Sequence, residues 1–99
     1  MVEERSLENW TKLQKSLNIG DVVSGTVFQI ENYGVYVDIG EDFYGIVLLP
    51  YISKERLESL SDYPQVGSIV NTIVIDFSFS KENIEFSYVV LSIKDYTYR

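Results

Sequence analysis

The stretch 32–40, NYGVYVDIG, decides the fold. Its alternate positions are aliphatic: Val35, Val37 and Ile39. The intervening Tyr36 and Asp38 point to the opposite face of the predicted strand. Two interpretations are open for the aromatic pair Tyr33 and Tyr36. They are wall residues of a barrel, since tyrosine is enriched in strands, or they form a platform on which a flat ligand stacks.

The segments on either side of this strand have the same β character. We predict five strands, over residues 22–30, 34–39, 43–49, 69–79 and 84–93, with a bend or bulge at Gly25 and a short helical turn between the third and fourth strands. Five strands with a helical connection at that point match the order of elements in an OB-fold barrel. The pattern therefore favours an all-β, closed architecture over a sandwich.

The N-terminal segment has a different period. Its apolar residues are three or four apart, which is the spacing of one face of a helix: Leu7, Trp10, Leu13 and Leu17. A lone helix of this length is marginal in water, so we expect it to pack on the barrel. We therefore divide the chain into an amphipathic helix over residues 1–18 and a barrel domain over residues 19–99.

Composition excludes several classes of function. The 99 residues carry a net charge of −7 and contain no cysteine or histidine. Disulfides, the usual zinc sites and catalysis by a thiol or imidazole are thereby excluded, and we expect neither an enzyme nor a cofactor. No apolar segment is long enough to span a bilayer, and the polar N-terminus does not resemble a secretory signal. We expect a cytoplasmic protein. The acidic residues near Glu41 are best explained as a solvated turn, not a metal site.

Three stretches together resemble the S1 RNA-binding domain, a module with an OB-fold: IGDVVSGTVFQIENYGVYVDIGEDFYGIVLLPYIS, VGSIVNTIVID and VVLSIK. The resemblance covers residues 19–94. It implies single-stranded RNA as the ligand, with the two aromatics of the second strand stacking on bases. These positions are Tyr33 and Tyr36.

Other positions follow the family pattern only in part. The resemblance places an acidic contact residue at Asp76 and a basic one near Tyr88, where the charge is absent but an aromatic ring remains. A histidine expected on the third strand is replaced by Leu48. Because stacking residues are kept and charged ones are lost, the resemblance implies weak RNA binding. The net negative charge supports the same expectation, since nucleic-acid affinity comes mainly from lysine and arginine.

Three further residues are candidates for the binding surface. Tyr44 borders the same face of the barrel, with a rim residue as the alternative interpretation. Lys54 and Arg56 follow the third strand and are placed to contact phosphates, although a solvated polar turn also explains them.

The segment 77–90, FSFSKENIEFSYVV, is longer than the turn usual in this family. We expect an extended hairpin between the fourth and fifth strands, with Phe77 and Phe79 facing Ile84, Phe86 and Tyr88. The N-terminal helix covers this aromatic face, or the hairpin is an arm that binds a ligand or partner. The alternative to RNA binding is accordingly a protein–protein interaction module on an S1-like scaffold. Neither the identity of such a partner nor an oligomeric state follows from the sequence.

Overall fold

The computed structural model describes residues 7–53 and 57–93. Helix α1 (Leu7–Ser16) precedes five strands, and short 3-10 turns lie at Leu49–Tyr51, Leu60–Asp62 and Ile84–Phe86. The strands are β1 (Val22–Glu31), β2 (Gly34–Asp38), β3 (Gly45–Leu48), β4 (Ile69–Ser78) and β5 (Tyr88–Ile93). The predicted contacts Lys54 and Arg56 fall outside the described residues.

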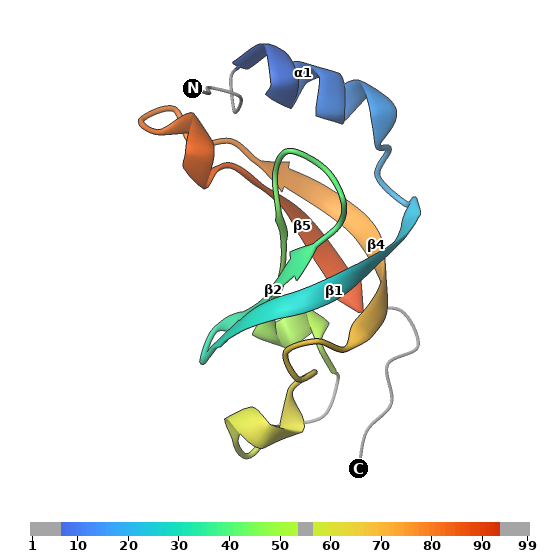
Figure 1. The fold of residues 1–99 in the computed structure, drawn as a ribbon, viewed down its shortest axis with the longest axis vertical. Helices are drawn as coiled ribbons and strands as arrows, with labels where there is room; N and C mark the ends of the chain where they lie inside the picture. Colours follow the sequence, from blue (N-terminus) through green and yellow to red (C-terminus); the bar gives the residue numbers. More distant parts are fainter. Residues whose placement is uncertain (1–6, 54–56, 94–99) are drawn as a thin grey trace.

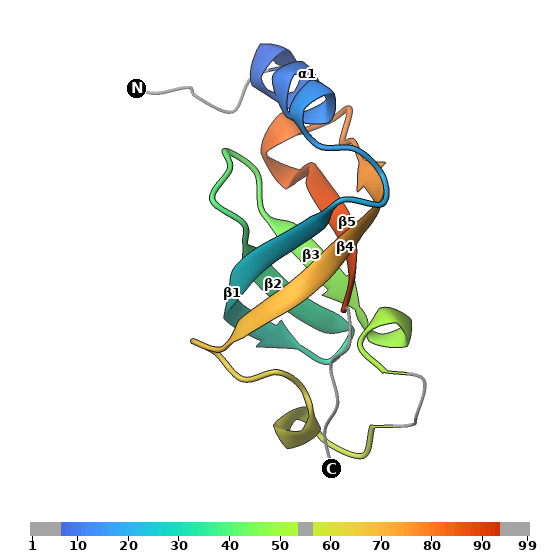
Figure 2. The ribbon, with the colours of Figure 1, turned by 90° about the vertical axis from the view of Figure 1, so that its right-hand side faces the viewer.

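The strands close into a barrel in the order β1-β2-β3-β5-β4, with β4 returning to β1 (Figures 1 and 2). All neighbouring pairs are antiparallel except β3 and β5, which are parallel. Closure removes the exposed strand edges that would otherwise pair with other chains. The predicted five-stranded OB-fold barrel with an N-terminal helix is confirmed.

The inner wall of the barrel forms the core that the alternation predicts. Side chains with no measurable exposure come from every strand: Val27, Val35, Val37, Val47, Val74, Val89 and Leu91. Each contributes about 1.5–3 kcal/mol relative to an exposed position. Because one face of each strand is committed to this core, the register fixes which side chains remain on the outside.

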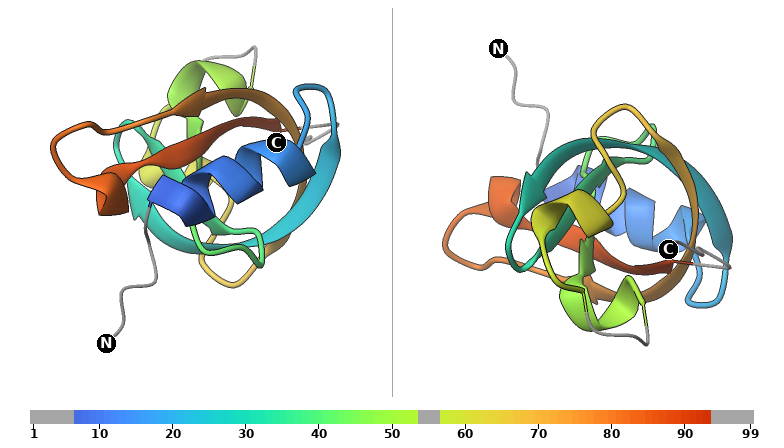
Figure 3. Two further views of the ribbon diagram at one scale, coloured as in Figure 1. Left: turned by 90° about the horizontal axis from the view of Figure 1, so that it is seen from above. Right: turned by 90° about the horizontal axis from the view of Figure 1, so that it is seen from below.

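Helix α1 lies across one end of the barrel (Figure 3). Trp10 and Leu13 are its buried residues. The indole of Trp10 meets the ring of Phe43 edge to face at 4.9 Å between centroids. It also meets Phe77 at 6.0 Å and Phe79 at 6.3 Å, so the helix covers part of the aromatic face of the β4–β5 hairpin.

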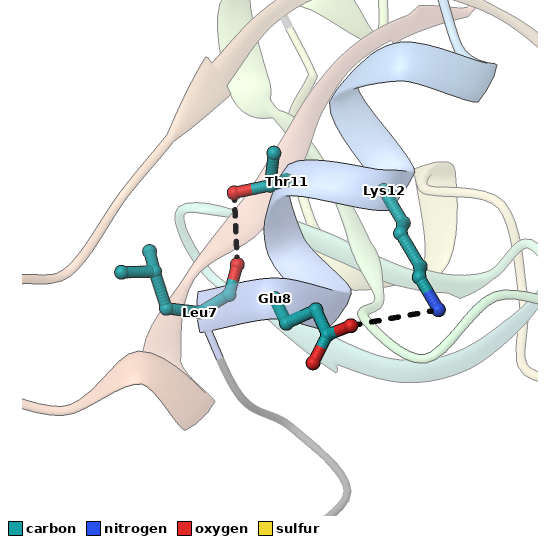
Figure 4. A network of polar contacts seen from close by, with 4 residues as sticks. All are labelled: Leu7, Glu8, Thr11 and Lys12. Atoms are coloured by element: carbon teal, nitrogen blue, oxygen red, sulfur yellow. Dashed lines mark hydrogen bonds and ion pairs between the residues drawn. The ribbon is translucent and has the colours of Figure 1, made fainter.

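The outer face of α1 is polar. Lys12 Nζ lies 3.9 Å from Glu8 Oε2, and the Thr11 hydroxyl donates a hydrogen bond to the carbonyl of Leu7 at 2.9 Å (Figure 4). An exposed ion pair of this kind contributes a few tenths of a kcal/mol. The docking of α1 therefore depends on its buried face.

The β4–β5 hairpin projects from the barrel beside α1 (Figure 1). Its ladder ends at the pair Ser78 and Tyr88. The fifth strand begins at Tyr88 and not at residue 84 as expected, because residues 84–86 form a 3-10 turn. The side chain of Asn83 accepts a hydrogen bond from the backbone N–H of Glu85 and starts this turn. Phe86 and Phe79 consequently do not face each other across a ladder.

Within the described ranges, no helix has the length and apolar character needed to cross a membrane.

Candidate nucleic-acid interface

Tyr33 and Tyr36 lie side by side on the outside of the barrel. Tyr33 occupies the turn between β1 and β2 and is 45% exposed, whereas Tyr36 is half-buried in β2. Their ring centroids are 6.2 Å apart at 71°, and their hydroxyl oxygens are 2.6 Å apart. Helix α1 does not cover them, because Trp10 contacts other rings at the end of the barrel. Both phenols are therefore accessible, and they present two planes in different orientations.

Gly34 allows the backbones of β2 and β3 to approach closely beneath these rings. A Cβ atom at this position would clash with the carbonyl oxygen of Val47 and lie 2.9 Å from Cα of Leu48. The two strands therefore pair in register from Gly34 opposite Leu48. This close pairing places the turn residue Tyr33 next to the outer face of β2.

Strand register extends the outer face beyond β2. Tyr36 is opposite Ile46 of β3, which in turn pairs with Val90 of β5, and Val90 pairs with Asp76 of β4. Directly opposed residues share a face. Ile46 is only 4% exposed although it lies opposite Tyr36 and Val90 on the outer face, so it forms an apolar floor between them.

Tyr44 and Tyr88 continue the ring surface. The centroid of Tyr44 lies 5.3 Å from that of Tyr36, and the ring of Tyr44 is nearly parallel to that of Tyr88, at 8° and 6.4 Å. The parallel pairing of β3 and β5 places these two residues at equivalent positions just before Gly45 and Val89. The structure thus brings together all four tyrosines that the sequence indicates.

A fifth ring, that of Phe28, was not predicted. Phe28 is 45% exposed and meets Tyr36 at 6.0 Å and Tyr44 at 6.4 Å. It lies at a β-bulge, because Val27 pairs with Val37 whereas Gln29 pairs with Tyr36. Gly25, where a bend or bulge was predicted, pairs with Val70 without a register shift, so the bulge of β1 lies at Phe28 instead. We call the rings of Phe28, Tyr33, Tyr36, Tyr44 and Tyr88 the aromatic surface.

Asp76 lies apart from the aromatic surface. It is exposed, its carboxylate accepts a hydrogen bond from the N–H of Phe77, and it lies on β4, which does not pair with β2. Leu48, at the position of the family histidine, is half-buried on the same face as Ile46. It offers apolar contact but no hydrogen bond.

Charge around the aromatic surface is negative. The basic side chains in the described ranges are Lys12, Lys15 and Lys81, which lie on α1 and in the β4–β5 hairpin and not in any strand. Glu31 ends β1 and accepts a hydrogen bond from Gln29 at 2.7 Å. The described part of the barrel therefore supplies stacking surface without phosphate neutralisation.

The surroundings of the Tyr36 hydroxyl change its ionisation. Its hydrogen bond with Tyr33 raises the pKa of Tyr36 well above its ordinary value near 10, and partial burial and the nearby Tyr33, Tyr44 and Glu31 raise it further. The hydroxyl of Tyr36 is accordingly uncharged at neutral pH.

Comparison with protein families decides the classification. The model of the S1 RNA-binding domain matches residues 16–89. The chain belongs to the S1 RNA-binding domain family. This S1 domain is 38% identical over 93 residues to the small ribosomal subunit protein bS1 of Staphylococcus saprophyticus, covering 91% of the chain and 22% of that protein. It is 35% identical over 60 residues to the polyribonucleotide nucleotidyltransferase of Psychrobacter arcticus, covering 61% of the chain and 9% of that enzyme.

Solved structures show the same fold. The S1 domain superposes on GSP13 from Bacillus subtilis with a TM-score of 0.63 at 23% identity, covering 78% of this chain and 55% of that one. The alpha subunit of aIF2 from Pyrococcus abyssi gives a TM-score of 0.62 at 22% identity, over 81% of this chain and 30% of that one. The chain thus spans about a fifth of the bS1 proteins that it resembles.

Proposed function

We propose that this S1 domain binds single-stranded RNA weakly, by stacking of bases on Tyr33 and Tyr36. The observation that carries the proposal is the placement of these two rings, uncovered and adjacent, on the outer wall of an S1 barrel. Single-stranded bases stack on exposed aromatic side chains with little dependence on sequence. In this proposal Tyr44 and Tyr88 extend the stacking surface.

The affinity is expected to be low. Each stacked base contributes about 1–3 kcal/mol, but the described strands lack lysine and arginine for phosphate contacts. Lys54 and Arg56 are the proposed phosphate contacts, and Asp76 is a peripheral acceptor for a ribose hydroxyl or base. The complex of a/eIF2alpha with aDim2p and rRNA from Pyrococcus horikoshii, which matches this fold with a TM-score of 0.62 at 21% identity, is in keeping with RNA as the ligand.

The test is a titration with a fluorescein-labelled octauridylate at low salt. We expect Tyr36→Ala to abolish measurable binding while circular dichroism shows that the variant remains folded. A matched control is Ile69→Ala, which truncates an exposed residue on the outer face of β4 and should leave binding unchanged. Absence of wild-type binding at roughly 0.1 mM RNA, the weak end of non-specific affinities, would reject the proposal.

A second candidate is a protein–protein interaction module, and the charge distribution favours it. The described strands contain Glu31, Asp38 and Asp76 but no basic residue. Such a surface suits a basic protein partner better than a polyanion. Retention of one partner at fixed stoichiometry after RNase treatment, together with no binding of the octauridylate, would decide for this candidate.

The proposed activity is binding alone, without catalysis, cofactor or metal, and its proposed location is the cytoplasm. The absence of cysteine and histidine supports this assignment, as do relatives named as ribosomal proteins. The division into a helix over residues 1–18 and a barrel over 19–99 belongs to the same proposal, in which the helix stabilises the barrel and the barrel binds RNA.

A further inference from the structure

Phe28 points outward next to a β-bulge, which is a local departure from regular pairing. Val27 faces the core and has no exposed surface, and regular alternation would leave Gln29 inside. The extra residue at the bulge leaves both Phe28 and Gln29 outside, and Ile30 packs against the core instead. Bulges re-aim side chains and are over-represented next to functional sites.

The barrel does not require an aromatic residue at this position. The core beneath β1 is filled by Val27, and the ring of Phe28 lies outside it with 45% of its surface in contact with solvent. Phenylalanine has no polar atom to satisfy at an exposed position, so its contact with water is unfavourable. A ligand that covers the ring would remove this cost.

The neighbours of Phe28 belong to the surface proposed to bind RNA. Its ring meets Tyr36 at 61° and Tyr44 at 73°, and those two meet each other at 53°. The three rings therefore surround a common point and none is parallel to another. A base that stacks on Tyr36 or Tyr44 consequently has Phe28 within reach of its edge or of its ribose.

We infer that Phe28 is a further nucleotide-contacting residue, which extends the RNA-binding surface from β2 and β3 onto β1. This inference rests on the proposed function. The contact is apolar and aromatic, made to the nucleotide held at Tyr36 and Tyr44. Since the ring carries no charge, its contribution to affinity is independent of salt concentration.

Four variants test the inference with the labelled octauridylate. Phe28→Ala should weaken binding about tenfold, whereas Phe28→Trp should retain it. Phe28→Leu keeps apolar bulk beside Tyr36 and Tyr44 but removes the aromatic ring, and it should bind as weakly as the alanine variant. Val22→Ala truncates another exposed residue of the same strand, opposite Ile73, and should not change binding. Circular dichroism and amide NMR spectra verify that each variant is folded.

The outcomes separate the two proposals. Wild-type affinity in Phe28→Leu would overturn the inference, because it would show that bulk supporting the tyrosines is sufficient. Wild-type affinity in Phe28→Ala, with binding lost in Tyr36→Ala, would also overturn it and leave the proposed function standing. Failure of the wild type to bind the octauridylate would reject the proposed function itself. A tenfold loss that has the same size at low and high salt supports the inference.

Discussion

The hydroxyl oxygens of Tyr33 and Tyr36 lie 2.6 Å apart, so one hydrogen bond joins the turn after β1 to the outer face of β2. The hydrogen bond with Tyr33 is the main reason that the pKa of Tyr36 is raised, and partial burial and the nearby Tyr44 and Glu31 raise it further. The pair holds the two rings edge to face. A base that stacks on one ring therefore meets a surface whose orientation is already set.

This hydrogen bond predicts a loss of stability at alkaline pH. The pKa of Tyr36 is higher in the folded state than its unfolded value near 10, so its stabilisation is complete below about pH 10. As the pH rises further, the unfolded chain releases the proton first and unfolding is favoured. We expect Tyr33→Phe to reduce the steepness of this loss between about pH 9 and pH 11 in urea unfolding. Tyr51→Phe, a change at an exposed tyrosine outside the aromatic surface, is the control; an equal effect of both variants would contradict the prediction.

Salt dependence separates stacking from phosphate contacts. Each phosphate neutralised on a single strand contributes about 0.7 to the slope of log K against log salt. We expect a shallow slope for the wild type and a slope near zero for the double variant Lys54→Ala, Arg56→Ala, whereas Tyr36→Ala lowers affinity and leaves the slope unchanged. Octauridylate titrations at three salt concentrations measure this. The control Lys12→Ala, Lys15→Ala changes the same charge on α1; an equal change of slope there would show that Lys54 and Arg56 make no specific contact.

Trp10 is expected to hold the helix on the barrel. Its indole is buried against Phe43, Phe77 and Phe79, and truncation of a buried tryptophan costs about 3–5 kcal/mol. Trp10→Ala should therefore lower the urea midpoint followed by circular dichroism. Leu7→Ala on the same helix removes a residue that is 61% exposed and should cost less than about 0.5 kcal/mol. Similar losses in both variants would contradict the prediction, because the buried indole would then stabilise the protein no more than an exposed residue of the same helix.

Gly34 is expected to tolerate no side chain. In Gly34→Ala the added methyl group would meet backbone atoms of Val47 and Leu48, which cannot move without breaking the β2–β3 ladder. Overpacking of this kind costs about 1–3 kcal/mol, and the displaced turn should also weaken RNA binding. Thermal unfolding and octauridylate titration measure the two effects. Thr26→Ala, on the exposed face of β1, is the control for stability; a Gly34→Ala protein as stable as this control would contradict the prediction.

Much of the fold was predictable because local pattern and tertiary structure agree. The alternation of Val35 and Val37 with Tyr36 gives the correct inner and outer faces of β2. Once the buried face of β2 is known, the register of the adjacent strand β3 is restricted, because a shift of one residue would turn its buried side chains outward. The stripe containing Trp10 and Leu13 likewise identifies the buried face of α1. In each case, burial follows a period that is visible in a single segment.

The remaining features depend on partners that a single segment does not reveal. Phe28 reads as one more apolar strand residue, because the rings that it contacts, those of Tyr36 and Tyr44, come from other segments of the chain. The start of β5 was misplaced because the bond from Glu85 to Asn83 favours a 3-10 turn over continued pairing. Apolar composition alone predicts a regular strand both around Phe28 and over residues 84–86. The roles of the individual site residues in binding remain predictions.

One consequence follows from the contact between α1 and the loop before β3. Phe43 points inward to Trp10, and the next residue, Tyr44, points outward to the aromatic surface. Trp10 is the only tryptophan of the chain. The fluorescent indole therefore contacts Phe43, whose chain neighbour Tyr44 belongs to the proposed RNA-binding surface. A change in tryptophan emission on adding RNA would report binding to the barrel face without any attached dye.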